Sequence, residues 1–201
     1  MDQPPAPSST KLEFRALTPD CDRKAFSCGK PEIDGWFREK SLKKHEKYLY
    51  RVTTAHLAGN SSPAGYYALT VARGDRDHLK NEAKNYGFDG DFFPSVHLHY
   101  LAMFSNLQRQ GFGSRVLMHA IERVYKISRY AGAYTMTLVS LDEKSTAFYQ
   151  SLGFETYGPA SQHPLMLLPI QSIVDLVEGT RPWPRALAPM LAAADAAKAA
   201  S

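Results

Sequence analysis

Cysteine is scarce in this sequence. Cys21 and Cys28 are the only two among 201 residues, so a disulfide framework is excluded and a reducing compartment suits the chain. No apolar run is long enough to span a bilayer. Residues 1–10 lack the basic segment and the apolar stretch of a secretory signal, and they are expected to form a disordered leader. We therefore expect a cytoplasmic protein with no membrane attachment.

Charge of one sign is not in large excess. The formal net charge is +4 and the pI is near 9.0. This balance excludes a histone-like polycation and leaves open both an anionic ligand and an ordinary solvated surface. Hydrophobic residues make up 44% of the chain, which is enough to bury one sizeable core. We predict one domain over residues 11–179 and a Pro- and Ala-rich tail over residues 180–201.

The apolar pattern predicts an α/β fold. Alternation and β-branched or aromatic runs predict strands at 11–17, 48–57, 64–72, 96–103, 133–141, 154–157 and 165–170. Apolar residues at helical spacing predict helices at 31–47, 111–129 and 144–152. Residues 73–94 are expected to form a long irregular connection. Because helices separate only some of the strands, the sheet should be mixed rather than wholly parallel.

Two glycines, Gly111 and Gly113, open the second predicted helix. Glycine lets a ligand approach the backbone, and first-turn N–H groups at the positive end of a helix dipole bind anions such as phosphate. A dinucleotide fingerprint would need a third glycine where Val116 stands, and a P-loop would need Gly-Lys-Ser/Thr, which is absent. The stretch therefore predicts a phosphate site of another kind.

The pattern Gln108-x-x-Gly111-x-Gly113 resembles the pyrophosphate-binding motif of the GNAT superfamily of N-acetyltransferases. The later segment STAFYQSLGF, from Ser145 to Phe154, resembles the motif of that superfamily in which Phe-Tyr precedes a Gly-Phe turn. The resemblance covers roughly residues 12–170. It implies a mixed, mostly antiparallel twisted sheet flanked by helices, with acetyl-CoA lying between two splayed central strands.

The resemblance also implies roles for individual residues. Tyr149 is expected to be the general acid that protonates the leaving CoA sulfur, the alternative being an aromatic residue that only packs against CoA. The pantetheine amides are expected along Leu101–Met103 and the pyrophosphate on the N–H groups of residues 109–114. The full set of expected cofactor-binding residues is Leu101, Ala102, Met103, Gln108, Arg109, Gln110, Gly111, Phe112, Gly113, Ser114, Ser140 and Phe148.

A second resemblance concerns a subgroup. FSCGKPEIDGWFREKS, residues 26–41, and AGYYALTVA, residues 64–72, look like segments of the GNAT toxins of bacterial toxin–antitoxin pairs. That resemblance implies acetylation of the α-amino group of aminoacyl-tRNA and a ribbon-helix-helix antitoxin as partner. We also expect a homodimer. Cys28 would be a buried thiol and Asp34 a polar anchor. Those toxins usually carry an arginine where this chain has Tyr100.

The acceptor side is expected to involve Arg73, Arg76, His99 and Tyr100, since basic residues would contact tRNA phosphates. His97 and His99 share one face of a strand and could relay a proton, the alternative being structural histidines. With no third ligand in sight, we expect no metal. An α-amino group titrates near ~7.7–8.0 and needs no strong base, unlike a lysine near ~10.4. A stand-alone acetyltransferase for another amine and a non-enzymatic acyl-CoA-binding module remain as alternatives.

Overall fold

The computed structural model describes residues 11–79, 87–88 and 90–180. The predicted leader, residues 181–201 of the predicted tail, and most of the stretch between 79 and 90 lie outside the described residues. The chain forms two compact units. The described part of the first unit is residues 11–69 and 100–120, and the described part of the second is residues 70–79, 87–88, 90–99 and 121–180.

Seven strands form one mixed sheet, as predicted. The hydrogen-bonded order is β1-β2-β3-β4-β5-β7-β6. The bounds of the strands are β1 Leu12–Ala16, β2 Arg51–Leu57, β3 Gly65–Asp75, β4 Phe92–Met103, β5 Thr135–Val139, β6 Glu155–Tyr157 and β7 Leu165–Pro169. The β4–β5 ladder is parallel, whereas the ladders β1–β2, β2–β3, β5–β7 and β6–β7 are antiparallel. The parallel ladder ends at Leu98↔Leu138 although β4 continues to Met103, so the mixed, mostly antiparallel sheet with splayed central strands is confirmed.

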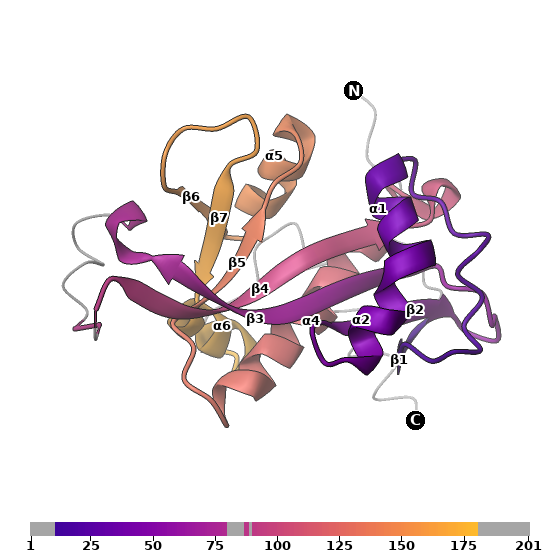
Figure 1. The fold of residues 1–201 in the computed structure, drawn as a ribbon, viewed down its shortest axis with the longest axis horizontal. Coiled ribbons are helices and arrows are strands. Elements are labelled where there is room, and N and C mark those ends of the chain that lie inside the picture. The colour runs from indigo at the N-terminus through magenta and orange to yellow at the C-terminus, as the bar shows by residue number, and fades with distance from the viewer. Residues whose placement is uncertain (1–10, 80–86, 89, 181–201) are drawn as a thin grey trace. The chain divides into compact units, whose positions relative to one another are not determined.

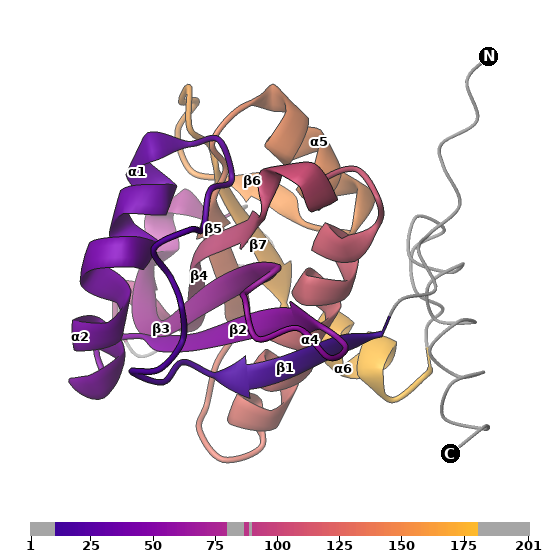
Figure 2. The same cartoon turned by 90° about the vertical axis from the view of Figure 1, so that its right-hand side faces the viewer.

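One helical path crosses the first unit from Pro31 to Glu46, as the sequence predicts. It consists of α1 (Pro31–Gly35), a π-helical turn η1 (Trp36–Lys40) and α2 (Ser41–Glu46). Figures 1 and 2 show this path beside β2 and β3. Pro31 suits the first turn, because proline has no N–H to leave unpaired there.

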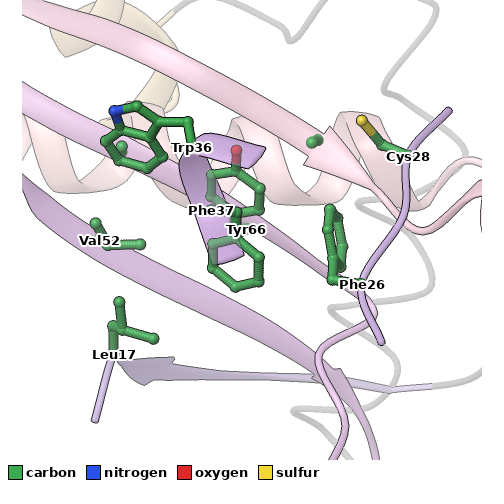
Figure 3. Close-up of a cluster of buried hydrophobic side chains, with 9 residues drawn as sticks. Leu17, Phe26, Cys28, Trp36, Phe37, Val52 and Tyr66 are labelled. Carbon is green, nitrogen blue, oxygen red and sulfur yellow. The ribbon is translucent and has the colours of Figure 1, made fainter. Parts of the chain in front are cut away.

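An aromatic cluster fills the core between this helical path and the sheet (Figure 3). The Phe37 and Tyr66 rings stack at 4.0 Å, and Phe26 packs edge-on against Phe37 at 4.9 Å. Trp36 lies parallel to Tyr66 at 6.1 Å. Offset and edge-on aromatic pairs are worth about 0.5–1.5 kcal/mol beyond the area they bury. The cluster therefore fixes α1 and η1 on this face.

The other face of the first unit carries the beginning of α4 (Phe112–Ser128). Tyr67 follows Tyr66 on β3 and so points to the opposite face. Its hydroxyl shares a 2.9 Å hydrogen bond with His119 Nδ1, and the His119 ring stacks on Phe14 of β1 at 3.8 Å. Alternation along β3 thus gives each face of the sheet its own helix.

In the second unit, β5 runs between β4 and β7, and α5 (Glu143–Ser151) and α6 (Ile170–Val177) follow β5 and β7 along the chain (Figure 1). The apolar centre is formed by Leu79, Phe93 and Leu167, with Tyr134 and Tyr157 packed against it. Gly153 ends α5 with φ +91°, which confirms its predicted place at the helix C-terminus.

Three details of the predicted element list were wrong. Residues 48–50 were expected in a strand but form the turn that follows α2, and β2 begins at Arg51. The expected irregular stretch 73–94 begins and ends in strand, because β3 continues to Asp75 and β4 starts at Phe92, with an Arg76 N–H to Asp91 O bond of 2.8 Å linking them. Helix α6 was not expected at all; its buried Ile173 and Leu176 provide the apolar face that holds it.

Candidate active site

The loop between β4 and α4 contains two residues with left-handed backbone conformations. Gly111 has φ +83°, which glycine adopts without steric cost, and Arg109 has φ +61°, which costs a non-glycine residue about 1–2 kcal/mol. A short 3₁₀ turn, η3 (Ser105–Leu107), precedes them. The two reversals turn the chain sharply, so that α4 starts directly after the loop at Phe112.

The first turn of α4 has the properties of an anion site. Arg115 N–H bonds to Gly111 O at 3.4 Å. The N–H groups of Phe112, Gly113 and Ser114 precede that bond and have no acceptor within the helix. Because α4 is 17 residues long, its dipole favours negative charge at this end.

Gly113 leaves space in front of this turn. A Cβ built on Gly113 would meet only Met103 Cγ, at 3.7 Å, which is an ordinary contact. The packing of the protein therefore does not require glycine at 113. A side chain at position 113 would occupy space beside the N–H groups of the first turn of α4, which glycine leaves open. The residues present therefore fit a bound phosphate or pyrophosphate.

A hydrogen-bond network ties the loop to the segment before α1. Gln108 Nε2 donates to Cys28 O at 2.8 Å and to Met103 O at 3.1 Å. Asp34, which is 3% exposed, accepts from Cys28 N–H at 2.7 Å and from Ser27 Oγ at 3.0 Å. The Gln108 side chain is thus engaged with protein carbonyls, and the loop is tied to the segment before α1.

The predicted structural roles of Cys28 and Asp34 are confirmed. Cys28 is buried, and desolvation together with a hydrogen bond to Asp34 raises its pKa to about 11. Burial alone would raise the pKa of Asp34, but the hydrogen bonds from Cys28 and Ser27 and the charge of Arg38 bring that pKa below its usual value. The thiol is therefore protonated and the carboxylate ionised at neutral pH.

The predicted pantetheine strand is the end of β4. Ala102 is a buried member of the aromatic cluster, whereas Leu101 is half-buried. Met103 is buried on the side of Gly113. Gln110 is half-buried and donates from Nε2 to Asn106 O at 2.8 Å within the loop. Residues 101–103 and 108–114 therefore lie together in the first unit.

Tyr149 lies on α5 in the second unit and is 9% exposed. Its ring packs against Phe148 at 5.2 Å and Phe154 at 5.5 Å. Burial raises the pKa of Tyr149 above its usual range, so its hydroxyl stays protonated. The hydroxyl can therefore act as a hydrogen-bond and proton donor over the whole physiological pH range.

The start of α5 is tied to the end of β5 by a polar cluster. Asp142 accepts from Ser145 N–H at 2.8 Å in a capping box. The buried Ser140 hydroxyl shares hydrogen bonds with Ser145 Oγ at 2.9 Å and Thr146 Oγ1 at 2.7 Å. Sequence reasoning selected Ser140 and missed the other three. The signal was present, since Asp-x-x-Ser before a helix is a typical N-terminal cap.

The expected acceptor residues are divided between the two units. Arg73, Arg76 and His99 belong to the second unit, and Tyr100 belongs to the first. The Arg73 guanidinium lies over the Phe92 ring at 4.1 Å. The Tyr100 hydroxyl donates to Glu32 Oε1 at 3.2 Å, and burial followed by the Glu32 charge raises the Tyr100 pKa to about 12.

His97 has the features of a structural histidine. Its Nδ1 shares a 3.1 Å hydrogen bond with Thr137 Oγ1. Burial, and then the neighbouring His99, lower the pKa of His97 to about 4. At neutral pH His97 is therefore uncharged and a weak base.

In residues 11–79, 87–88 and 90–180, no three histidine, cysteine or acidic side chains gather as metal ligands would. No helix in that part of the chain is both long and apolar enough to cross a membrane.

Comparison with known proteins gives a consistent set of relatives. The model of the acetyltransferase (GNAT) family matches residues 24–154. A tRNA-acetylating toxin of Mycobacterium tuberculosis is 29% identical over 154 residues, or 77% of this chain and 90% of the toxin. The structure of AtaT complexed with acetyl-methionyl-tRNAfMet has a TM-score of 0.75 at 26% identity, covering 83% of this chain and 99% of that chain. The structure of AtaTR bound with AcCoA has a TM-score of 0.72 at 27% identity, covering 83% and 98%.

Proposed function

Since the chain belongs to the acetyltransferase (GNAT) family and is an N-acetyltransferase, we propose that it transfers acetyl from acetyl-CoA to the α-amino group of an aminoacyl-tRNA. The observation that carries the proposal is the loop of Arg109 and Gly111 in front of α4. Its left-handed residues and free first-turn N–H groups form a cradle suited to the pyrophosphate of CoA. The pantetheine arm would then follow residues 101–103 of β4.

The proposed reaction is a direct displacement. The neutral amine attacks the thioester carbonyl, a C–N bond forms, and the C–S bond breaks. Tyr149 gives its proton to the departing sulfur, the nitrogen loses a proton to solvent, and Tyr149 is reprotonated. Burial supports this role because the raised pKa of Tyr149 keeps the proton in place until charge develops on sulfur.

The low basicity of His97 favours an α-amino acceptor over a lysine. A histidine with a pKa of about 4, such as His97, cannot readily deprotonate a lysine whose pKa is near ~10.4. An α-amino group near ~7.7–8.0 is partly neutral at pH 7 without assistance. The similarity to a tRNA-acetylating toxin points to the same acceptor.

The proposal extends to the partners of the protein. As a toxin-type enzyme of the cytoplasm, it would be silenced by a ribbon-helix-helix antitoxin, and it would act as a homodimer. If a small ribbon-helix-helix gene adjoins this one, its co-expression should relieve any growth arrest that the enzyme causes. Size-exclusion chromatography with light scattering gives the oligomeric state.

The deciding experiment measures transfer of labelled acetyl from acetyl-CoA to aminoacyl-tRNA. Acetylated α-amino groups together with growth arrest on expression support the proposal. Acetylation of free small amines or protein lysines, with charged tRNA untouched, would show a stand-alone acetyltransferase instead. Binding of CoA without turnover on any amine would contradict catalysis altogether.

A further inference from the structure

Tyr48 lies just after the end of α2, in a conformation that normally selects glycine. Its φ is +59°, its N–H bonds to His45 O at 3.1 Å, and Leu49 N–H bonds to Lys44 O at 3.1 Å. This is the hydrogen-bond pattern of a Schellman helix end, in which the left-handed residue is usually glycine. Tyr48 is nevertheless 80% exposed. The fold thus accepts backbone strain for a tyrosine whose ring contributes little to the core, and such strain often marks a functional position.

The surroundings of Tyr48 are strongly basic. Residues 38–51 contain six lysines and arginines and two glutamates, so this short segment has the same surplus, +4, as the entire chain. Lys40, Lys43 and Lys47 recur at helical spacing and are exposed. Within the described parts of the chain, no carboxylate forms an ion pair with any of these three lysines. Their charges are therefore available to an anionic partner.

Aromatic and cationic groups meet at this helix end. The Arg51 guanidinium lies 5.0 Å from the centre of the Tyr48 ring. Lys44 Nζ lies 5.3 Å from the Tyr50 ring. Proteins that hold unpaired nucleotides combine these elements, since bases stack on aromatic rings while lysine and arginine contact the phosphates.

We propose that Tyr48, with Lys43, Lys47 and Arg51, forms an RNA-binding surface on which an unpaired base stacks against the Tyr48 ring. The inference rests on the proposed function, since it assigns a contact surface for the tRNA acceptor. An acidic protein would need only the charges and would not require a strained, protruding ring. A lipid bilayer would need a broader apolar face than Tyr48 and Leu49 present.

The first test distinguishes the contribution of the Tyr48 ring to RNA binding from the effect of its left-handed backbone on stability. Binding of a deacylated tRNA transcript is followed by fluorescence anisotropy without acetyl-CoA, and Tm is measured in parallel. Tyr48→Ala should weaken binding about tenfold, and Tyr48→Phe should retain it. Tyr48→Gly should weaken binding equally while raising Tm by roughly 2–4 °C, because glycine relieves the left-handed strain. Tyr130→Ala is the matched control, since Tyr130 is 94% exposed outside this surface.

The second test concerns the charges. Replacing Lys43 and Lys47 by glutamine should reduce the slope of log K against log salt by about 1.5 for two lost phosphate contacts. Unchanged affinity in Tyr48→Ala, or an equal loss in Tyr130→Ala, would overturn the stacking role. An unchanged salt slope would overturn the surface itself.

Failure of this inference differs from failure of the proposed function. If wild-type protein binds tRNA through Tyr48 and yet transfers no acetyl group to charged tRNA, the surface stands and the reaction is wrong. If charged tRNA is acetylated with equal kcat/KM by wild type and Tyr48→Ala, the reaction stands and the surface is wrong.

Discussion

Replacing Gln108 by alanine tests whether its two hydrogen bonds control donor binding. The side chain makes two hydrogen bonds, to Cys28 O at 2.8 Å and to Met103 O at 3.1 Å. Each is worth about 1 kcal/mol net, so about 2 kcal/mol of positioning is lost. If all of it is expressed in pyrophosphate binding, KM for acetyl-CoA rises by about 30-fold, since about 1.4 kcal/mol corresponds to tenfold.

The assay compares two donors, acetyl-CoA and acetyl-pantetheine, which lacks the pyrophosphate. Gln108→Ala should lower kcat/KM for acetyl-CoA and leave that for acetyl-pantetheine nearly unchanged. Gln171→Ala is the matched control, because this substitution removes one hydrogen bond, to Asp175 Oδ1 at 2.9 Å, within helix α6 of the second unit. A decrease of the same size for both donors would refute the positioning role, and so would no decrease for either.

Three further predictions follow from buried groups. Tyr149→Phe should lower kcat by roughly 10²–10⁴-fold with little change in KM. Because the pKa of Tyr149 is raised, wild-type activity should rise to a plateau near the acceptor pKa of ~7.7–8.0 and show no alkaline decline below about pH 10. Steady-state kinetics across pH measures both effects. The pKa of His97 is lowered to about 4, so between about pH 6.5 and 4 the unfolded chain binds a proton at His97 that the folded chain does not. The free energy of unfolding should therefore fall by up to about 3 kcal/mol as pH drops through that window. Urea unfolding of His97→Gln should lack this pH-dependent loss of stability. Burial raises the pKa of Cys28 to about 11, so iodoacetamide at pH 8 should modify Cys28 in urea but not in the native protein. Mass spectrometry measures the modification. Rapid labelling of the native protein would contradict a buried thiol.

The glycine stretch was predictable because its signal is local. Gly111 and Gly113 stand before a long amphipathic helix, and both the turn and the helix depend on neighbours in sequence. The partner of Gln108 was not predictable in this way, since Cys28 lies 80 residues earlier and only the folded sheet brings the two together. Sequence patterns therefore indicated the loop before α4 but not the Gln108–Cys28 hydrogen bond that holds it.

The errors in the element list have physical causes. Residues 48–50 are Tyr-Leu-Tyr, a composition that favours strands, but the helix-end hydrogen bonds to His45 and Lys44 decide their conformation. Helix α6 directly follows β7, and the apolar run across Pro169 and Ile170 hides the change of period. At residues 73–75 the exposed side of β3 carries polar side chains, so composition alone resembled a loop.

The hydrogen bond from Gln108 to Cys28 has a consequence for protein engineering. In a chimera with a relative, a crossover placed anywhere between residues 34 and 103 separates the Ser27–Asp34 segment from the loop that it supports. We expect that exchanging the N-terminal third to alter acceptor choice would then also disturb donor binding. The reason is that the carbonyl at position 28 of the other parent need not lie within hydrogen-bond distance of Gln108. Designs that transfer residues 27–34 together with 103–111 keep the donor loop intact and let the acceptor surface vary independently.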